Sequence, residues 1–485
     1  MSVMLADQLG KMTGLHVYPR SISQGEGATY YLARDGSHRL LGILGEATGF
    51  EGTPRGDVRL CPLTAANAAV LRERLPWLRP QPLGLVRSVG CGDRLGLATP
   101  GHVRAVRQAG GIAPIFAQQS IRENARTGRA SREVVDDAMW GVFQEGWRAP
   151  WGADADHLKT LDALDDCVAA GYSFFTLDPG DYVDASAHAA PLSALSSKRD
   201  ALPWKDLETN PADLQAAYLG QSFHLDGGHS LTFTEETLWR AAGKYGHAIA
   251  HVLRLYRRLA SQVRDFDLEV SVDETETPTS PLEHYFIANE LRRLQIQWIS
   301  LAPRYVGRFE KGVDYIGNLV EFEADLAMQV AVARTLGPYK LGIHSGSDKF
   351  SLYPIFARHA SGLVHLKTAG TSYLEALRAI GGSEPGLFRD IYQLAFERYA
   401  QDRASYHVSA DTSLAPPLRS LRDADLPGVL DQFDAREMLH VTFGSALAKY
   451  GTQLKESLEV HEEAYYAALV SHFGRHLRPL AGGAN

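Results

Sequence analysis

Cysteine is scarce in this 485-residue sequence. The three cysteines, Cys61, Cys91 and Cys167, lie far apart and form no CxxC pair. An odd, sparse set argues against a disulfide framework and a thiolate zinc site, and it favours a reducing compartment. The first residues lack the pattern of a signal peptide, and no run of 18 apolar residues occurs, so a membrane partner is not expected. We therefore expect a soluble cytoplasmic protein.

An excess of basic charge is also missing. The net charge is -8, with both signs interspersed along the chain, whereas binding to nucleic acid requires a concentrated basic face. Several motifs are absent as well, namely the phosphate-binding GxxxxGK[ST], the nucleophile elbow GxSxG and the metalloprotease HExxH. The segment Gly90-Cys91-Gly92 lacks the third glycine and the helix of a dinucleotide site. These absences exclude several common classes of enzyme and any nucleic-acid partner.

What the sequence does contain is a regular alternation of short apolar runs and amphipathic helical stretches. Continuous apolar runs are typical of strands buried on both faces of a parallel sheet. Their alternation with helices predicts an α/β protein with a (β/α)8 TIM-type barrel, and a doubly wound open sheet is the alternative. Nine runs are candidates, so one of them, the first or the last, should not be a barrel strand. The runs are residues 83–90, 112–118, 151–158 (a weak one), 172–180, 268–274, 296–303, 339–346, 362–370 and 406–411.

Three other regions flank or interrupt the predicted barrel. Residues 1–80 predict a small α/β unit with two β-rich runs and a helix capped by Thr64. The barrel domain is expected at 81–424 and contains a helical insertion at 185–262, whose Ala- and Ser-rich first part carries no strand signal. Residues 425–485 consist mainly of helix formers and predict a helical extension.

Polar residues end the apolar runs, and barrel active sites are built at the C-terminal ends of the strands. Three histidines stand out there: His157 among acidic residues, His344 and His365. Because a barrel brings its strand ends around one axis, these imidazoles could converge on one divalent cation, although the sequence does not choose among Zn, Mn, Fe, Co and Ni. For any one of them, the alternative is a hydrogen-bonded core or loop residue.

Acidic and basic residues accompany these histidines. Asp156 could act as a base or orient His157, and Asp273 and Glu274 are candidate catalytic acids or loop residues. Basic groups at the run ends suit an anionic substrate, although surface pairing explains any single one equally well. The further candidates for substrate binding are Arg94, Gln119, Asp178, Arg304, Arg308, Ser345 and Lys367, together with Asp273.

Several long blocks of sequence resemble the tagaturonate epimerase family at collinear positions between residues 92 and 378. They include GVFQEGWRAPWGADADHLKT (141–160), SVDETETPTSPLEH (271–284), GPYKLGIHSGSDKFSLYP (337–354) and GLVHLKTAGTSYLEALR (362–378). The resemblance implies an isomerase of hexuronate catabolism that interconverts D-tagaturonate and D-fructuronate with a divalent metal.

The resemblance also implies roles for individual residues. It suggests His157, His344 and His365 as metal ligands and Asp156 with Glu274 as the proton-transfer pair, with Asp273 in contention with Glu274. The substrate carboxylate would be bound by a basic residue such as Arg304, Arg308 or Lys367.

The chemistry of these two uronates restricts the mechanism. They differ at a carbon β to the ketone, and the carbonyl does not acidify the C–H bond of this carbon. Direct proton exchange is therefore unfavourable, and two routes remain: retro-aldol cleavage with re-addition, and transient oxidation by a nicotinamide. The missing dinucleotide fingerprint weighs against oxidation, and a Lewis acid favours the retro-aldol route. The rival functions are a metal-dependent epimerase of fructose and tagatose, a sugar isomerase or aldolase, and a non-catalytic sugar-acid-binding protein. A homo-oligomer is not excluded.

Overall fold

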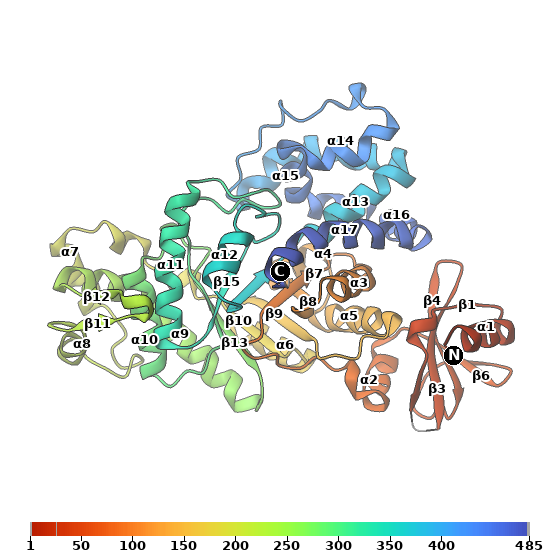
Figure 1. The fold of residues 1–485 in the computed structure, drawn as a ribbon, viewed down its shortest axis with the longest axis horizontal. Coiled ribbons are helices and arrows are strands. Elements are labelled where there is room, and N and C mark those ends of the chain that lie inside the picture. Colours follow the sequence, from red (N-terminus) through yellow and green to blue (C-terminus); the bar gives the residue numbers. More distant parts are fainter. Residues whose placement is uncertain (1, 26, 483–485) are drawn as a thin grey trace.

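A closed barrel of parallel strands lies at the centre of the computed structural model, which describes residues 2–25 and 27–482 (Figure 1). The strands follow one another around the barrel in the order β10-β13-β14-β15-β16-β7-β8-β9. This closure confirms the predicted (β/α)8 barrel and excludes the open sheet. The strands are β7 (Ser88–Gly92), β8 (Ala113–Ser120), β9 (Gly152–Leu158), β10 (Phe174–Leu177), β13 (Asp267–Ser271), β14 (Ser300–Ala302), β15 (Lys340–Ile343) and β16 (Val364–Lys367).

The ninth apolar run, residues 406–411, is a loop and not a strand. Its backbone N–H groups bind side chains instead of a neighbouring strand: Ser409 donates to Glu310 at 2.9 Å, and Ala410 donates to Glu437 at 2.7 Å. The run at 151–158, which gave only a weak signal, forms β9, a strand that is buried except for His157. The apolar character of a run therefore does not by itself decide whether the run forms a barrel strand: residues 406–411 form a loop, and the more polar residues 152–158 form a strand.

Helices surround the barrel and connect its strands. Helix α3 (Thr99–Ala109) has Pro100 in its first turn, where the missing N–H of proline costs nothing. Most of the other helices have either a proline in this position or a preceding residue whose side chain accepts a hydrogen bond from a first-turn N–H. The helices are α3 (Thr99–Ala109), α4 (Ile121–Thr127), α5 (Ser131–Glu145), α6 (Leu161–Ala170), α10 (Pro281–Arg293), α11 (Leu319–Leu336), α12 (Tyr353–His359) and α13 (Thr371–Ser383).

The insertion lies between β10 and β13, at one end of the molecule (Figure 1). It contains α7 (Leu192–Asp200), α8 (Pro211–Tyr218) and the long α9 (Glu235–Gln262). The expectation that its first part lacks strands was wrong, because β11 (Ser222–His224) and β12 (Ser230–Thr232) form an antiparallel hairpin. Aromatic contacts of Phe223 in this short hairpin anchor it to the helices beside it, a tertiary effect that the local composition did not indicate.

The N-terminal part lies at one end of the molecule, whereas the C-terminal end of the chain lies over the barrel in this view (Figure 1). The N-terminal part forms an antiparallel sheet, and its second helix is capped by Thr64, whose side chain accepts a hydrogen bond from the Asn67 N–H at 3.2 Å, as predicted. Its elements are α1 (Ser2–Thr13), β1 (His16–Val17), β2 (Ser23–Gly25), β3 (Ala28–Asp35), β4 (His38–Gly45), β5 (Thr53–Arg55), β6 (Val58–Pro62) and α2 (Ala65–Arg74).

The C-terminal part is helical, and it packs against the helices that follow the last and first barrel strands. Helix α17 contacts α3, α12 and α13, and α15 contacts α13 and α14. The helices of this part thus reach the side of the barrel where β16 meets β7. They are α14 (Pro385–Asp402), α15 (Phe433–Val441), α16 (Phe443–Val460) and α17 (Glu462–Leu480).

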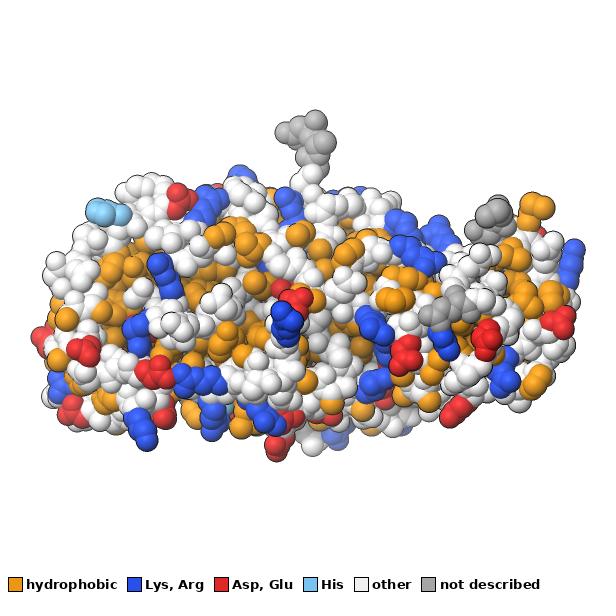
Figure 2. Space-filling view, turned by 90° about the horizontal axis from the view of Figure 1, so that it is seen from below, with side chains coloured by type: hydrophobic (Ala, Val, Ile, Leu, Met, Phe, Trp, Pro, Cys, Tyr) orange, Lys and Arg blue, Asp and Glu red, His pale blue; other side chains and the backbone are white. Residues whose placement is uncertain are grey.

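The helices and the side chains on one face of the surface bear on two features, a membrane span and a strongly charged face. Within residues 2–25 and 27–482, none of the helices has the length and apolar character needed to cross a bilayer. On the face drawn in Figure 2, acidic and basic side chains are scattered among apolar ones.

Candidate active site

A polar cavity opens at the C-terminal ends of the barrel strands. Its lining combines carboxylates, imidazoles and basic groups contributed by several strand ends and by the loops that follow them. Eight of the residues predicted from the sequence line this cavity: Arg94, Asp156, His157, Asp273, Glu274, His344, Ser345 and Lys367.

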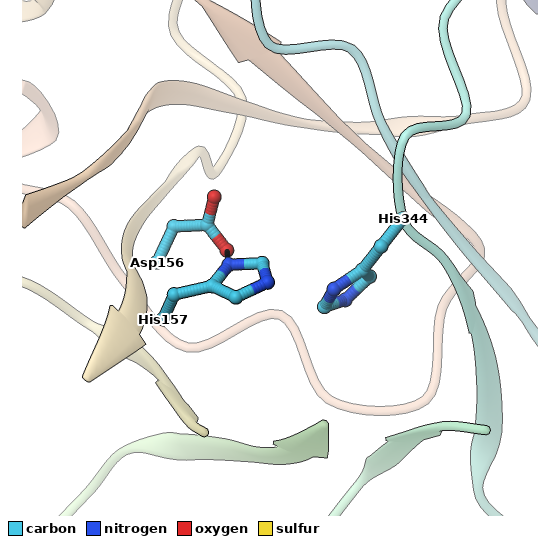
Figure 3. Close-up of side chains that lie close together, drawn as sticks. All are labelled: Asp156, His157 and His344. Carbon is cyan, nitrogen blue, oxygen red and sulfur yellow. Dashed lines mark hydrogen bonds and ion pairs between the residues drawn. The ribbon is translucent and has the colours of Figure 1, made fainter. Parts of the chain in front are cut away.

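Two imidazoles face each other across the cavity, one from the end of β9 and one from the loop after β15 (Figure 3). The rings of His157 and His344 are 5.0 Å apart, centroid to centroid. His157 Nδ1 lies 2.7 Å from a carboxylate oxygen of Asp156, and His344 Nε2 lies 2.6 Å from Glu269. The other nitrogens face Asp273 Oδ1, at 3.0 Å from His344 Nδ1 and 3.6 Å from His157 Nε2. Each ring is thus oriented by a carboxylate on one side and presents its other nitrogen to a shared space.

The electrostatics of this pair follow from those carboxylates. Burial alone would lower the pKa of both imidazoles, because desolvation penalises the charged form. For His157, the carboxylates of Asp156 and Asp273 outweigh burial and hold the pKa well above its usual range. For His344, Asp273 and Glu269 do the same and raise the pKa to about 9. In the absence of a metal, both imidazoles are therefore cationic at neutral pH.

The residues fit a divalent cation on the chemistry of their donor atoms. Asp156, His157 and His344 each offer one ligand atom, and these atoms lie within 4.8 Å of one another. His157 Nε2 is buried and has no hydrogen-bond partner among the described residues. A metal-binding histidine commonly donates its other ring N–H to a carboxylate, and both imidazoles here have such a carboxylate.

Beneath the imidazoles lies a buried lysine surrounded by acids. Lys367 Nζ is 2.9 Å from Asp154, 2.6 Å from Asp156 and 3.0 Å from Glu269. Burial would lower the lysine pKa, but these carboxylates outweigh it and hold the pKa well above its usual range. Gly342 on β15 leaves room for this layer, because a Cβ there would stand 2.6 Å from Glu269 Oε2.

Glu274 occupies the outer part of the cavity between two basic side chains. Arg122 contacts its carboxylate at 2.8 Å and Lys311 at 3.9 Å, and His157 lies 4.0 Å away. Burial raises the carboxyl pKa, but His157, Lys311 and Arg122 together lower it to about 2. Lys311 also donates to Ser345 Oγ at 2.6 Å. Glu274 is therefore ionised and stands where a proton could be exchanged with a bound molecule.

The backbone near the cavity is held in unusual conformations. His157, Ser345 and Asp348 have φ values of 58°, 47° and 63°, in the left-handed region that non-glycine residues rarely adopt. Such strain persists only where the surroundings determine it, and it is common at functional sites.

His365 lies deeper in the barrel than the facing imidazoles. Its Nδ1 is 2.9 Å from Ser88 Oγ, and its Nε2 is 4.0 Å from Asp154. Its pKa is lowered because burial outweighs the nearby acids. The described residues form three groups with metal-ligand spacing, and none of these groups contains His365.

Four further candidates lie outside the cavity lining. Gln119 accepts a hydrogen bond from Arg129 at 3.1 Å, while its neighbour Gln118 points into the cavity and donates to Asp156 at 2.8 Å. Asp178 forms a candidate ligand group with His157 and Glu274. The backbone N–H of Arg304 binds Thr279, and Arg308 pairs with Glu310 at 3.3 Å.

Several residues of the site were not predicted from the sequence. Glu269 is a charged residue within the apolar run that forms β13, and that exception to the pattern was a usable signal. Gln118 could have been chosen over Gln119 only with knowledge of which face of β8 points inward. Lys311 and His440 reach the cavity from a long loop and from the C-terminal helix α15, and no local pattern marked them.

The whole chain is similar to known epimerases. A sequence model of the tagaturonate epimerase family matches residues 18–480. The tagaturonate/fructuronate epimerase of Thermotoga maritima is 42% identical over 98% of both chains. Crystal structures of the fructuronate-tagaturonate epimerase of Cohnella laeviribosi are 38% identical. The native one has a TM-score of 0.92 over 98% of this chain and 99% of that one. One with two glycerol molecules has a TM-score of 0.93 over 99% of both chains.

Proposed function

This chain belongs to the tagaturonate epimerase family, and from that premise we propose that it interconverts D-tagaturonate and D-fructuronate with the help of a divalent cation. The chain is therefore an enzyme, an isomerase that acts on carbohydrates. The observation that carries the metal proposal is the facing pair of His157 and His344, each backed by its own carboxylate. Zn, Mn, Fe, Co and Ni all accept this mixture of nitrogen and oxygen donors.

Within this proposal, His157, His344 and Asp273 would hold the cation, because His157 Nε2 and His344 Nδ1 both face Asp273 Oδ1. Asp156 and Glu269 fix the ring orientation and the tautomer of the two histidines. The chemistry that a bound divalent cation supplies is Lewis-acid polarisation of the substrate's ketone and neighbouring hydroxyl.

The proton transfers fall to residues of the chain. The carbon to be inverted carries a hydroxyl, and Glu274 takes the hydroxyl proton from the outer side of the cavity while the C–C bond toward the ketone breaks. The carbinol carbon becomes an aldehyde, and the electron pair of the broken bond passes to the ketone fragment, which becomes an enediolate. The released aldehyde turns, the same bond forms again on its opposite face, and the proton returns to the new hydroxyl. Lys367, with its three N–H donors among acids, keeps Asp156 ionised and fixed beside His157. Atoms and electrons balance without any redox partner.

Measured metal content and turnover test the ligand assignment. His344→Ala should lose both its cation and its activity, whereas His365→Gln should keep its cation, since His365 lies outside the ligand groups. A His344→Ala enzyme with full metal and full turnover would refute the assignment. If His365→Gln lost its metal, a set of three histidines would be favoured instead.

Asp156 needs a separate test, because the family resemblance implies proton transfer and its contacts favour orientation of His157. As an orienting residue, Asp156→Asn should bind the cation about 10- to 100-fold more weakly. As a proton carrier, it should keep the cation and lose about 100- to 10,000-fold in rate.

Epimerisation in deuterated water should leave no deuterium on the inverted carbon, and deuterium found there would refute the cleavage route.

A further inference from the structure

His440 is a buried residue of the cavity that none of the steps above uses. It lies on α15 in the C-terminal helices and is 1% exposed, yet its ring lines the same cavity as His157 and His344. Among the described residues, neither ring nitrogen forms a well-aligned hydrogen bond, and only the backbone of Ala369 lies within reach of the ring. Buried polar atoms are nearly always paired, so an unpaired imidazole at a cavity wall indicates a missing partner.

Arg94, which also lines this cavity, has a buried nitrogen without a hydrogen-bond partner among the described residues. Its Nε and Nη2 bind Glu123 at 2.8 Å and 2.7 Å, and its guanidinium stacks on Phe443 with 3.6 Å to the ring centre. The remaining nitrogen, Nη1, is buried without a partner. The arginine is thus held rigidly on two sides, with a free donor left over.

A glycine brings these two side chains together. A Cβ on Gly370 would stand 2.2 Å from His440 Nε2 and 2.9 Å from Arg94 Nη2, so the imidazole and the guanidinium flank the same residue. Gly370 has φ 90° and immediately precedes α13, whose first-turn N–H groups have no acceptor within the helix. The first turn of a helix carries partial positive charge and favours anions.

Three basic side chains act on the His440 ring. Burial lowers its pKa, and the positive charges of Arg94, Lys311 and Arg436 lower it further, while the backbone of Ala369 opposes them weakly. Arg94 and Arg436 also pair with acids, Glu123 and Asp348. The imidazole is therefore neutral and offers one N–H donor in a positive environment. Asp156, Asp273 and Glu274 lie around the two facing imidazoles, whereas Glu123 pairs with Arg94 in this part of the cavity.

We propose that Arg94 and His440, at the N-terminus of α13, form the subsite that binds the carboxylate of the substrate. This inference rests on the proposed function, in which the substrate is a sugar acid, and it supplies the group that separates a uronate from a neutral ketose. The position agrees with barrel enzymes in general, where anions are often bound by the loops after the last two strands and a helix N-terminus. The bound carboxylate accepts hydrogen bonds from Arg94 Nη1 and from the His440 ring.

The test compares equilibrium binding of fructuronate and fructose to the metal-loaded protein by calorimetry at one salt concentration. The wild type should bind the uronate at least about tenfold tighter. His440→Leu should weaken uronate binding by about 10- to 100-fold, the range for a lost hydrogen bond to a charged group, and leave fructose binding unchanged. His440→Gln keeps a side-chain N–H donor and should recover part of the preference.

Two further variants guard against effects on folding. Arg94→Lys removes the unpaired Nη1 while keeping a charge for Glu123, so it should also lose uronate preference. His284→Gln is the matched control, because His284 is a buried histidine of α10 that binds Gln329 outside the cavity, and the preference should persist there.

Three results would overturn the subsite. The first is an unchanged uronate preference in folded His440→Leu or Arg94→Lys. The second is a wild type that binds both sugars equally. The third is tighter, His440-dependent binding of fructose 6-phosphate than of fructuronate, which would assign the site to a phosphate. Turnover is measured separately, so a preference that depends on His440 without any epimerisation would refute the proposed function and leave the subsite standing.

Discussion

Replacing Lys367 by methionine should destabilise the protein strongly, because its ammonium group is buried among three acids. The side chain is 3% exposed, and its nitrogen lies within 3.0 Å of Asp154, Asp156 and Glu269. Methionine fills a similar volume and removes the charge, so the barrel would keep its packing and lose the counter-ion. The acids would then be left buried and uncompensated, which is the costly state.

The size of the effect follows from buried ion pairs in general. Removing one partner costs about 3–5 kcal/mol. At about 2.1 cal/mol/K per residue, the unfolding entropy of this 485-residue chain is about 1 kcal/mol per kelvin, so the melting temperature should fall by about 3–5 °C. Burial raises the carboxyl pKa of Glu269, but Lys367 and His344 outweigh burial and hold this pKa well below its usual range. In the wild type, the ionised Glu269 therefore stabilises the fold above the pKa that the group has in the unfolded chain. Without Lys367 the acids take up protons more readily, and the deficit should shrink as the pH falls from 8 toward 5.

Scanning calorimetry of the variant and of a matched control checks this reasoning. Lys340, on the neighbouring strand β15, is also buried, but it donates to the Gly84 and Val86 carbonyls and to Ser88 Oγ. Lys340→Met therefore breaks hydrogen bonds to neutral acceptors, and the carboxylates of Asp267, Glu269 and Asp154 act on this lysine without direct contact. Its loss should be smaller and should not shrink in acid. Equal losses in both variants, or a Lys367→Met protein as stable as the wild type at pH 8, would refute the argument from uncompensated charge.

Two other perturbations address the C-terminal helices. Burial and the neighbouring Glu310 raise the pKa of Glu437 to about 8, so its stabilising contribution is complete below the unfolded pKa of 4.5 and is lost as the pH rises through 8. Glu437→Gln should therefore flatten the fall in melting temperature between pH 6 and pH 9, and an unchanged slope would contradict this pairing. Asp348→Asn should weaken the ion pair with Arg436, 2.9 Å in length, and loosen the loop that carries His344. We expect kcat to fall more than KM rises, and steady-state kinetics with unchanged kcat would count against this positioning role.

The strand-end rule found eight residues of the cavity lining, because barrel geometry brings the ends of its strands together. Any polar residue just after a central strand must lie near the barrel axis, and this condition correctly gathered His157, Asp273 and His344 in one cavity. The rule does not give depth along the axis. His365 and Lys367 belong to the same run, yet Lys367 lines the cavity whereas His365 binds Ser88 below it.

The register of a strand against its neighbours is a second property that could not be predicted from the sequence. Adjacent residues of a strand point to opposite faces, so a choice between Gln118 and Gln119 depends on where the strand begins its alternation. That starting point is set by pairing with neighbouring strands, and β8 shows a register shift against both β7 and β9. A local pattern cannot anticipate such irregularities, because they arise from contacts between distant segments.

The C-terminal helices explain why the remaining residues of the site were invisible in the sequence. The loop after β15 holds Ser345 and Asp348 at positive φ, a conformation that its own residues disfavour. Arg436 on α15 and His472 on α17 stabilise this conformation, because their side chains form ion pairs with Asp348. The same packing that stabilises the strained loop brings His440 to the cavity wall. The helical extension predicted at residues 425–485 therefore acts as part of the barrel mouth, because its side chains bind the strained loop and it contributes His440 to the cavity wall.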